Sequence, residues 1–190
     1  MFKRRKVRRR SRLTREEQGS WFSPAVIREI FSWILCAAAA IVAAVLLVIA
    51  FGKSVDVTSD AMSPTMEHGQ KALINRLKYQ MSTPAKGDMI LFFASGNQAR
   101  TYIRRVYGVP GDRILIERGR ICINGEYIEE DYEPMEDAGI AAEEILLDTG
   151  EYFVLGDNRN HCEDSRSINI GIVKKDTILG KIWRVYGEKN

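Results

Sequence analysis

The sequence predicts a mainly β domain of short antiparallel strands, preceded by one N-terminal transmembrane helix. Residues 31–51 carry no charge, and after Gly52 short runs rich in Ile, Val, Tyr and Phe alternate with Gly, Pro, Asn and Asp. Strand-forming residues separated by turn residues are typical of β structure. With 190 residues, 45% of them hydrophobic, the chain is long enough for an anchor and one domain with its own core.

The first segment, residues 1–30, is a basic tail. Residues 1–19 carry nine Lys or Arg and two acids. Because Lys and Arg beside a membrane span stay on the cytoplasmic side, we expect this tail in the cytoplasm and the rest of the chain outside it. Anionic lipid headgroups also attract such a tail. Residues 53–190 carry eighteen Lys or Arg against twenty-two Asp or Glu, so a nucleic-acid-binding face is not expected.

Residues 31–51 are the predicted membrane span. At about 1.5 Å per residue, 21 helical residues cover roughly 31 Å, which matches a hydrocarbon core of about 30 Å. The rival interpretation is a cleaved signal peptide. Its apolar part would be about 7 to 15 residues long and would end in small residues of the type Ala-x-Ala, which residues 50–54 do not provide.

The third segment, residues 52–190, is the predicted extracytoplasmic β domain. Asn124-Gly125 is a strong hairpin signal, because a type I′ turn needs positive φ at both central residues. Residues 117–120 predict another turn, and residues 109–112 place Pro and Gly as a type II turn requires. The predicted strands lie in the runs 71–79, 87–93, 100–109, 113–117, 120–123, 126–128, 151–157 and 178–187.

Residues 130–150 interrupt this pattern. The segment is acidic and lacks the alternation of a strand. We interpret it as a surface excursion from the sheet, with a helical turn around residues 140–147.

The three cysteines and two histidines predict no metal site, because they form no Cys-x-x-Cys pair and no zinc-type cluster. No cofactor is expected. Cys36 falls in the apolar run, so Cys122 and Cys162 alone could form a disulfide outside the membrane. Two free thiols are the other interpretation.

Four stretches in the β domain have the order and spacing of a known family. They are "AMSPTM" (61–66), "KGDMILF" (86–92), "YIRRVYGVPGD" (102–112) and "GDNRNHCEDSR" (156–166), and "INIGIVKKDTILGK" (168–181) looks like the closing strand. Together with the preceding anchor, they resemble the bacterial type I signal peptidases, which are membrane-anchored serine proteases that remove signal peptides. The resemblance covers nearly all of the chain from residue 31.

The resemblance implies a signal-peptidase-like β domain with a Ser nucleophile and a Lys general base. It also implies a substrate chain in extended conformation, with small residues before the cut, that adds to a strand edge. In this sequence the expected edge is residues 56–60, together with the strand that leads into Tyr102.

The catalytic positions of the family are changed in this chain. Ala61 stands at the nucleophile position, Arg104 at the general-base position and Cys162 at the position that orients the base. A methyl group cannot attack a carbonyl, and a guanidinium does not lose its proton near neutral pH. Ser59 matches the position that assists the oxyanion hole.

Other family positions remain. The positions that the resemblance assigns to substrate binding are Asp60, Met62, Pro64, Thr65 and Tyr102. The charged positions expected to form ion pairs around the active-site loops are Arg105, Asp157, Asp164 and Arg166.

Three functional hypotheses follow from these residues. The first is a catalytically inactive family member that binds signal-peptide-like or pilin-type secreted chains, or assists pilus or surface-protein assembly. The second is an active signal peptidase in which Ala61 is an engineered knockout, which leaves Arg104 unexplained. The third is catalysis by substitute groups, with Ser63, His161, Cys162 and His68 as the candidates.

Overall fold

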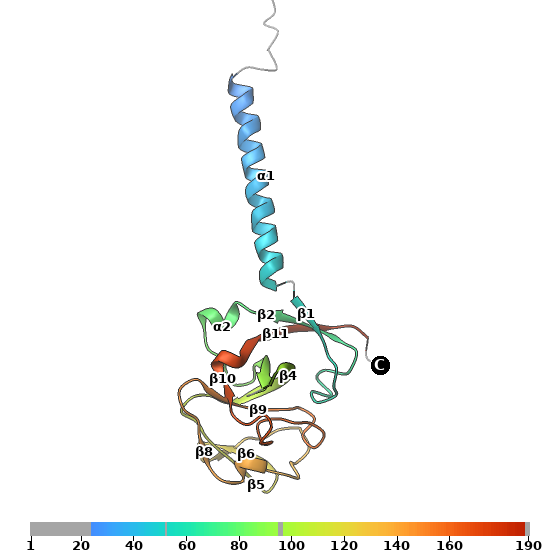
Figure 1. Ribbon diagram of the computed structural model, residues 1–190, viewed down its shortest axis with the longest axis vertical. Coiled ribbons are helices and arrows are strands. Elements are labelled where there is room, and N and C mark those ends of the chain that lie inside the picture. Colours follow the sequence, from blue (N-terminus) through green and yellow to red (C-terminus); the bar gives the residue numbers. More distant parts are fainter. Residues whose placement is uncertain (1–23, 52, 95–96, 189–190) are drawn as a thin grey trace, which may run out of the picture. The chain divides into compact units, whose positions relative to one another are not determined.

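The computed structural model describes residues 24–51, 53–94 and 97–188 (Figure 1). Most of the tail predicted for residues 1–30 lies outside this range. The chain divides into two units, one that ends at Ala44 and one that contains the β domain. The helix and the β domain are therefore described separately.

The N-terminal helix α1 runs Pro24–Phe51 and contains the whole predicted span. Proline is favoured in the first turn of a helix, and the Ala- and Leu-rich run that follows favours helix. Between residues 24 and 48 every side chain is exposed. The helix is long and apolar enough to cross a membrane.

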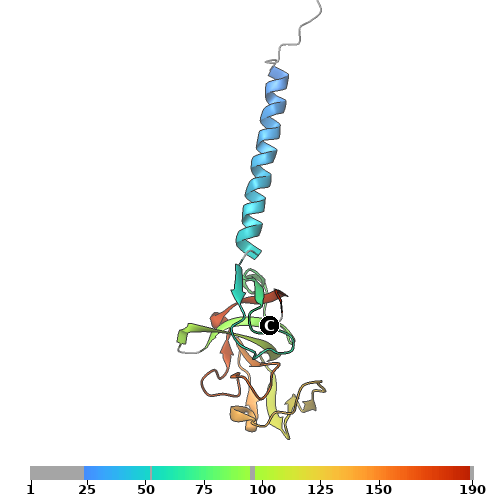
Figure 2. The ribbon, with the colours of Figure 1, turned by 90° about the vertical axis from the view of Figure 1, so that its right-hand side faces the viewer.

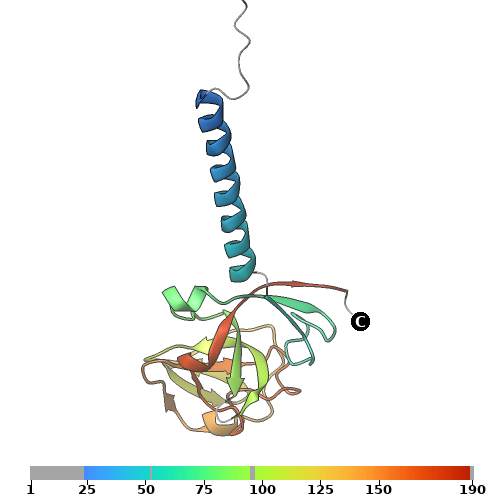
Figure 3. The same cartoon turned by 45° about the horizontal axis from the view of Figure 1, so that its top comes forward.

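The β domain contains a seven-stranded sheet with the strand order β1-β2-β11-β3-β4-β9-β10. All of its neighbouring strands are antiparallel. Figure 3 shows β11 running to the C-terminus, between β2 and β3 in the strand order. The strands are β1 Lys53–Asp56, β2 Lys71–Asn75, β3 Met89–Ala94, β4 Asn97–Gly108, β9 Glu151–Leu155, β10 Val173–Lys174 and β11 Ile178–Tyr186.

A second sheet, with the order β7-β6-β5-β8, is formed by the chain between β4 and β9. Figure 2 shows it at the opposite end of the domain from β1. Its central hairpin turns at Arg118 and Gly119, and the next turns at Asn124 and Gly125, where both turns were predicted. All four residues have positive φ, which was the prediction for Asn124 and Gly125. The strands are β5 Arg113–Glu117, β6 Arg120–Ile123, β7 Glu126–Tyr127 and β8 Ile145–Leu146.

Three clusters of buried apolar residues hold the domain together. One joins β5 and β6 to β9, and a second covers one side of the large sheet between β3, β4, β9 and β10. The third packs the segment 57–66 against β2, β3 and β11. This third cluster supports the turn that contains Ala61.

The fold class is confirmed, with corrections to individual elements. The run 71–79 was predicted as one strand, but β2 ends at Asn75 and a short helix α2 follows at Lys78–Met81. The Asn75 side chain accepts hydrogen bonds from the N–H groups of Leu77 and Lys78. An Asx turn of this kind ends a strand.

The interpretation of residues 130–150 as a surface excursion is partly wrong. A 3₁₀ turn η1 forms at Gly139–Ala142, but Ile145–Leu146 pair with β5 as β8 instead of continuing a helix. Met135, Ala141 and Leu147 are buried in the cluster of the small sheet. Burial of these apolar side chains decided the conformation, although their spacing follows no regular period.

The predicted edge strand 56–60 is also shorter than expected. β1 ends at Asp56, and the ladder-like bonds continue only through Val57, whose N–H donates to Gln70 O and whose carbonyl accepts from Gly69 N–H. The chain then turns at residues 61–66. A second 3₁₀ turn, η2 Lys175–Thr177, leads into β11.

Candidate functional site

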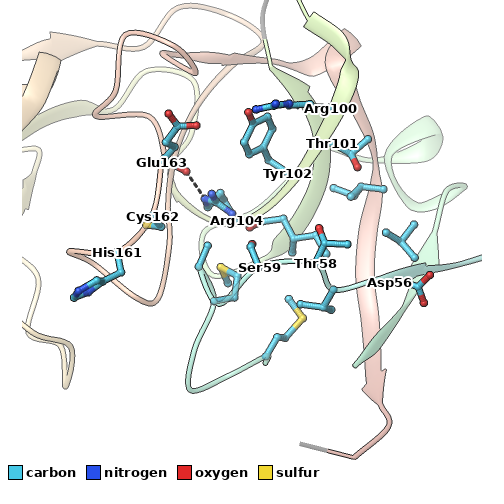
Figure 4. A pocket seen from close by; sticks show the side chains of 17 residues that line it. Asp56, Thr58, Ser59, Arg100, Thr101, Tyr102, Arg104, His161, Cys162 and Glu163 are labelled. Carbon is cyan, nitrogen blue, oxygen red and sulfur yellow. Dashed lines mark hydrogen bonds between the residues drawn. The ribbon is translucent and has the colours of Figure 1, made fainter. Parts of the chain in front are cut away.

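A groove with a cavity of about 530 Å³ lies between two extended segments of the β domain. One wall is residues 55–59, which lead into Ala61, and the other is residues 100–104 of β4. The loop 161–163 closes the groove beside Arg104 (Figure 4). Ala61, Arg104, Cys162 and Ser59, which the sequence assigns to catalytic positions, therefore line one cavity.

Ala61 is held by contacts between its loop and the loop after β9. Its carbonyl accepts a hydrogen bond from Asn158 N–H at 3.1 Å, and the Asn158 side chain donates to Asp60 O at 3.1 Å. Gly156 makes this approach possible, since a Cβ there would lie 2.7 Å from Ala61 O and 2.3 Å from Cys162 Sγ. The Ala61 methyl is 4% exposed and supplies no reactive atom.

Arg104 is buried in the groove wall and bonded to the backbone. On β4 it lies opposite Ile90 of β3. Its Nε donates to Glu163 O at 2.6 Å and its Nη1 to Ile103 O at 2.6 Å, while its guanidinium carbon lies 5.6 Å from the centre of the Tyr102 ring. Burial lowers the pKa of Arg104 from its ordinary value. The group nevertheless remains a cation at neutral pH, because an arginine titrates far above the physiological range.

Cys162 is a protonated thiol beside this arginine. Its Sγ donates to an Asp164 carboxylate oxygen at 3.4 Å. Burial, followed by the negative charge of Asp164, raises the pKa of Cys162 to about 11. A cysteine attacks as the thiolate, so Cys162 is a poor nucleophile at neutral pH.

Two hydrogen-bond donors at the Ala61 end of the groove have no partner among the described residues. The Ala61 N–H and the Ser59 hydroxyl donate to no described group, and Ser59 is exposed to the groove. Backbone N–H and Ser hydroxyl groups are the donors from which oxyanion holes are built. This corner of the groove can therefore accept a negatively polarised oxygen.

Two ion pairs fix the loop that follows β9. Arg105 donates through Nε and Nη2 to the two carboxylate oxygens of Asp157, at 2.9 and 2.6 Å. Arg166 donates in the same way to Asp164, at 2.9 Å for each bond. Hydrogen bonding to Asp157 outweighs burial and raises the pKa of Arg105. Bidentate pairs of this kind orient a loop as well as stabilising it.

The predicted substrate residues divide into two groups. Met62 and Tyr102 line the groove. Pro64 and Thr65 lie on another side of the turn and do not line this cavity, because residues 61–66 fold back instead of continuing as a strand. Thr65 Oγ1 donates to Asp157 at 2.5 Å, and an Asp60 carboxylate oxygen accepts from His68 N–H. These two polar side chains support the turn.

The substitute groups do not form a catalytic pair. Ser63 would face the same side as Ala61 only in an extended strand, but it lies in a turn and outside the groove. His68 is exposed and also outside it, while His161 reaches the rim with an exposed side chain that points away from Arg104 (Figure 4). In the part of the chain that the structure describes, none of these side chains is recorded as bonded to another catalytic candidate.

Several groove residues escaped sequence reasoning. Thr58 lies in the predicted edge 56–60, and Arg100 and Thr101 lie in the strand that leads into Tyr102, but no role was assigned to their side chains. All three line the cavity together with Glu163, which acts through its backbone carbonyl, a group that the identity of a residue cannot reveal. Arg100 could have been found from the sequence, because side chains two positions apart on a strand point to the same face, which it shares with Tyr102 and Arg104.

The remaining site predictions concern metals and thiols. Among the described residues, no group of three or more His, Cys, Asp or Glu is arranged to hold a metal ion. Cys36, Cys122 and Cys162 are all free, so the interpretation with free thiols describes this structure.

The fold and site define a membrane-anchored β protein with an open groove between extended segments. The chain belongs to the signal peptidase family: the family described as "Signal peptidase, peptidase S26" matches residues 30–186. A signal peptidase IB of Staphylococcus aureus (strain COL) is 28% identical over 176 residues, which cover 82% of this chain and 88% of that protein. A probable signal peptidase I-2 of Synechocystis is 28% identical over 135 residues, covering 67% of this chain and 59% of its own length.

A solved structure is also similar. It is a crystal structure of a signal peptidase I from Enterococcus faecalis V583, 28% identical, with a TM-score of 0.42, and the match covers 53% of this chain and 97% of that one. Membership of the signal peptidase family implies secreted polypeptides that carry signal peptides as the molecules recognised.

Proposed function

We propose that this chain is a non-cleaving member of the signal peptidase family that binds secreted polypeptides in extended conformation. One observation carries the proposal. Ala61 and Arg104, which the resemblance assigns to the nucleophile and general-base positions, both line the same groove. This supports a groove that keeps the arrangement expected from the family, with side chains at two assigned positions that cannot act as nucleophile and base.

The loss of catalysis follows from the chemistry of these two residues. Acyl transfer needs a nucleophilic oxygen or sulfur and a neighbouring base that accepts its proton. Nucleophile and base act as a unit, so the absence of either one removes nearly all of the nucleophilic mechanism. Cys162, the thiol that lines the groove, has its pKa raised to about 11 and has a cation beside it where a base is needed.

The capacity to bind is supported by the groove walls. On one side β4 pairs with β3 through residues 101–105, but on its other side it pairs with β9 only from Arg105 onward. Within the described residues, the edge of β4 at residues 100–104 is thus open toward the groove. An extended peptide can add to such an edge through its main-chain groups, while side pockets select its side chains.

The location of the groove completes the proposal. The basic tail favours a cytoplasmic N-terminus and a single pass of α1 through the membrane, with anionic lipid beside the tail, which leaves the β domain outside the cytoplasm. Signal-peptide-like segments and pilin-type chains are the partners that this location allows. A role in assembling pili or other surface proteins would use such binding without cleavage.

The test compares cleavage of a preprotein with an Ala-x-Ala signal by three forms of the full chain in membranes. The unaltered chain is expected to leave the preprotein intact, while the triple variant Ala61→Ser, Arg104→Lys, Cys162→Ser is expected to cleave it. The matched control is the double variant Arg104→Lys, Cys162→Ser, which keeps Ala61 and should stay inactive. Gel mobility of the preprotein reports the result.

Cleavage by the unaltered chain would contradict the proposal. Binding is followed in the same membranes by crosslinking the preprotein to a photoreactive group at Thr101, in the groove wall. If the preprotein gives no crosslink with any of the three forms, the groove does not bind secreted chains. The part of the proposal that concerns binding then fails.

A further inference from the structure

Arg104 differs from the other buried arginines of the β domain in having no acidic partner. Arg104, Arg159 and Arg166 are 4%, 2% and 8% exposed. Arg159 pairs with Glu130 at 2.7 Å and Arg166 with Asp164 at 2.9 Å. In the described parts of the chain no carboxylate lies within ion-pair distance of Arg104.

A buried cation without a directly bonded counter-charge is costly, since burial removes water and carboxylates beyond ion-pair distance compensate only in part. A guanidinium has five N–H donors, and Arg104 uses Nε and Nη1 on two backbone carbonyls. Its Nη2 donates to no described residue. Because Arg104 lines the groove, a ligand there can reach the unused donors.

The acidic side chains of the groove are engaged elsewhere. Asp56 pairs with Lys71 at 2.9 Å, and the Glu163 carboxylate accepts from the Asn169 side chain at 3.2 Å. In Figure 4 the Glu163 carboxylate points away from Arg104. Burial lowers the pKa of Arg104, and Asp164 and Glu163 oppose this through space, but among the described residues neither forms an ion pair with it. A counter-charge bonded directly to Arg104 would therefore have to come from a ligand.

Three unused donors lie in the same groove: Arg104 Nη2, the Ala61 N–H and the Ser59 hydroxyl. A carboxylate is planar, negatively charged and accepts hydrogen bonds at two oxygens, which matches a guanidinium. Both groove walls lead to this corner, residues 55–59 toward Ala61 and residues 100–103 toward Arg104 (Figure 4). A peptide that lies between the walls would bring one of its ends to Arg104.

We infer that the Arg104 corner of the groove binds the C-terminal carboxylate of an extended peptide. This inference rests on the proposed function. It specifies that the groove prefers a bound peptide with a free C-terminal carboxylate. Hydrolysis of a peptide bond leaves such a carboxylate on the fragment before the cut. The site would therefore retain the product of a peptide-bond cleavage carried out by another enzyme.

The test measures binding of three labelled peptides to the full chain in detergent micelles by fluorescence anisotropy. All share one sequence ending in Ala-Ser-Ala; the first has a free C-terminal acid, the second a C-terminal amide, and the third continues with further residues. A hydrogen-bonded charge at a buried site corresponds to about tenfold to hundredfold in affinity. The free acid is expected to bind more tightly than the other two by this factor.

Two variants assign the preference to Arg104. Arg104→Met should bring the acid and amide to equal affinity. Arg100→Met removes another arginine of the same groove and should leave the ratio of acid to amide unchanged. The ratio of acid to amide affinity is also measured in the unaltered chain. The inference can therefore be tested even if a variant fails to fold.

Equal binding of acid and amide by the unaltered chain would overturn the inference and leave the proposed function standing. Tighter binding of an amidated peptide with an internal Glu would also overturn it, because the carboxylate would then belong to a side chain. Displacement of the acid peptide by acetate at equal concentration would reduce the site to one for small anions. If no peptide binds, the proposed function fails and the inference fails with it.

Discussion

A lysine at position 104 could lose its proton on burial, whereas the arginine keeps its charge and turns it toward backbone carbonyls. Arg104 donates to Glu163 O and Ile103 O, so its side chain fastens the loop 161–163 to β4. At this position the chain holds a structural cation, since a guanidinium keeps its proton near neutral pH.

Cys162 provides the prediction at this scale. With a pKa of about 11, roughly one thiol in a thousand is ionised at pH 8, against about a quarter for an ordinary thiol. Iodoacetamide should therefore modify Cys162 about a hundredfold more slowly in the folded chain than after denaturation. The rate should rise about tenfold per pH unit up to pH 11.

The measurement uses mass spectrometry of a Cys36→Ser, Cys122→Ser background, with Cys162→Ser added as the blank. Rapid modification of the folded chain at pH 8 would mean that Cys162 is a thiolate, and it would reopen the hypothesis of catalysis by substitute groups.

Individual site residues were predictable only through the motifs that contain them. Spacing and resemblance located Ala61, Arg104 and Cys162, which share one groove in the structure. The contact of Thr65 with Asp157 was not predictable, because it joins side chains 92 positions apart through tertiary packing. The hydrogen bond from Arg104 to the backbone carbonyl of Glu163 was also not predictable. Every residue type has the same carbonyl, so the sequence gives no signal for this acceptor.

At the scale of elements, turn chemistry was the most reliable guide. The hairpins at Arg118–Gly119 and Asn124–Gly125 formed where positive φ was required. The two-residue strands β8 and β10 were missed, because two residues cannot show alternation and their pairing depends on distant partners. α2 was missed for a similar reason, since its four residues are too few to show a helical period.

Asp88 connects three elements and provides the prediction at this scale. It accepts hydrogen bonds from Lys181 of β11 at 2.5 Å and from Tyr79 of α2 at 2.9 Å, just before β3 begins. Burial alone would raise the pKa of Asp88, but bonds from Lys181, the Ala85 N–H and Tyr79 lower it below its ordinary value of 3.8.

Because the folded-state pKa is the lower one, ionised Asp88 stabilises the fold above about pH 4. This stabilisation is lost as the pH falls from there through the folded-state pKa. The free energy of unfolding, measured by urea titration across this range, should fall more steeply with acid in the unaltered chain than in Asp88→Asn. Asp131→Asn, which changes an exposed side chain, should keep the original slope; equal slopes for all three proteins would contradict this role of Asp88.

At the scale of the whole molecule, the core of the β domain contains only residues of that domain. Among the described residues, its three buried clusters and their packed neighbours run from Val55 to Val185. The division into an apolar helix and a β domain was predictable from composition alone, because membrane spans and strands have different lengths and periods.

We therefore expect residues 53–190 to unfold cooperatively in the absence of α1, with a midpoint within a few degrees of that of the full chain. Thermal unfolding followed by circular dichroism measures this midpoint. A fragment that begins at residue 67 is the matched control, since it lacks β1 and the buried side chains of Val57, Met62 and Met66. Each buried side chain is worth about 2 kcal/mol, so this shorter fragment should unfold at a much lower temperature; equal midpoints for the two fragments would contradict the expectation.

The small sheet has a practical consequence for work on this protein. β4 and β9 are neighbours in the large sheet, yet residues 109–150 intervene between them and form the second sheet and its connections. The Asn124–Gly125 turn is exposed, joins β6 to β7 of the small sheet and contributes no residue to the groove lining. It is therefore the place at which an epitope tag or a fluorescent reporter can be spliced into the chain without touching the peptide path.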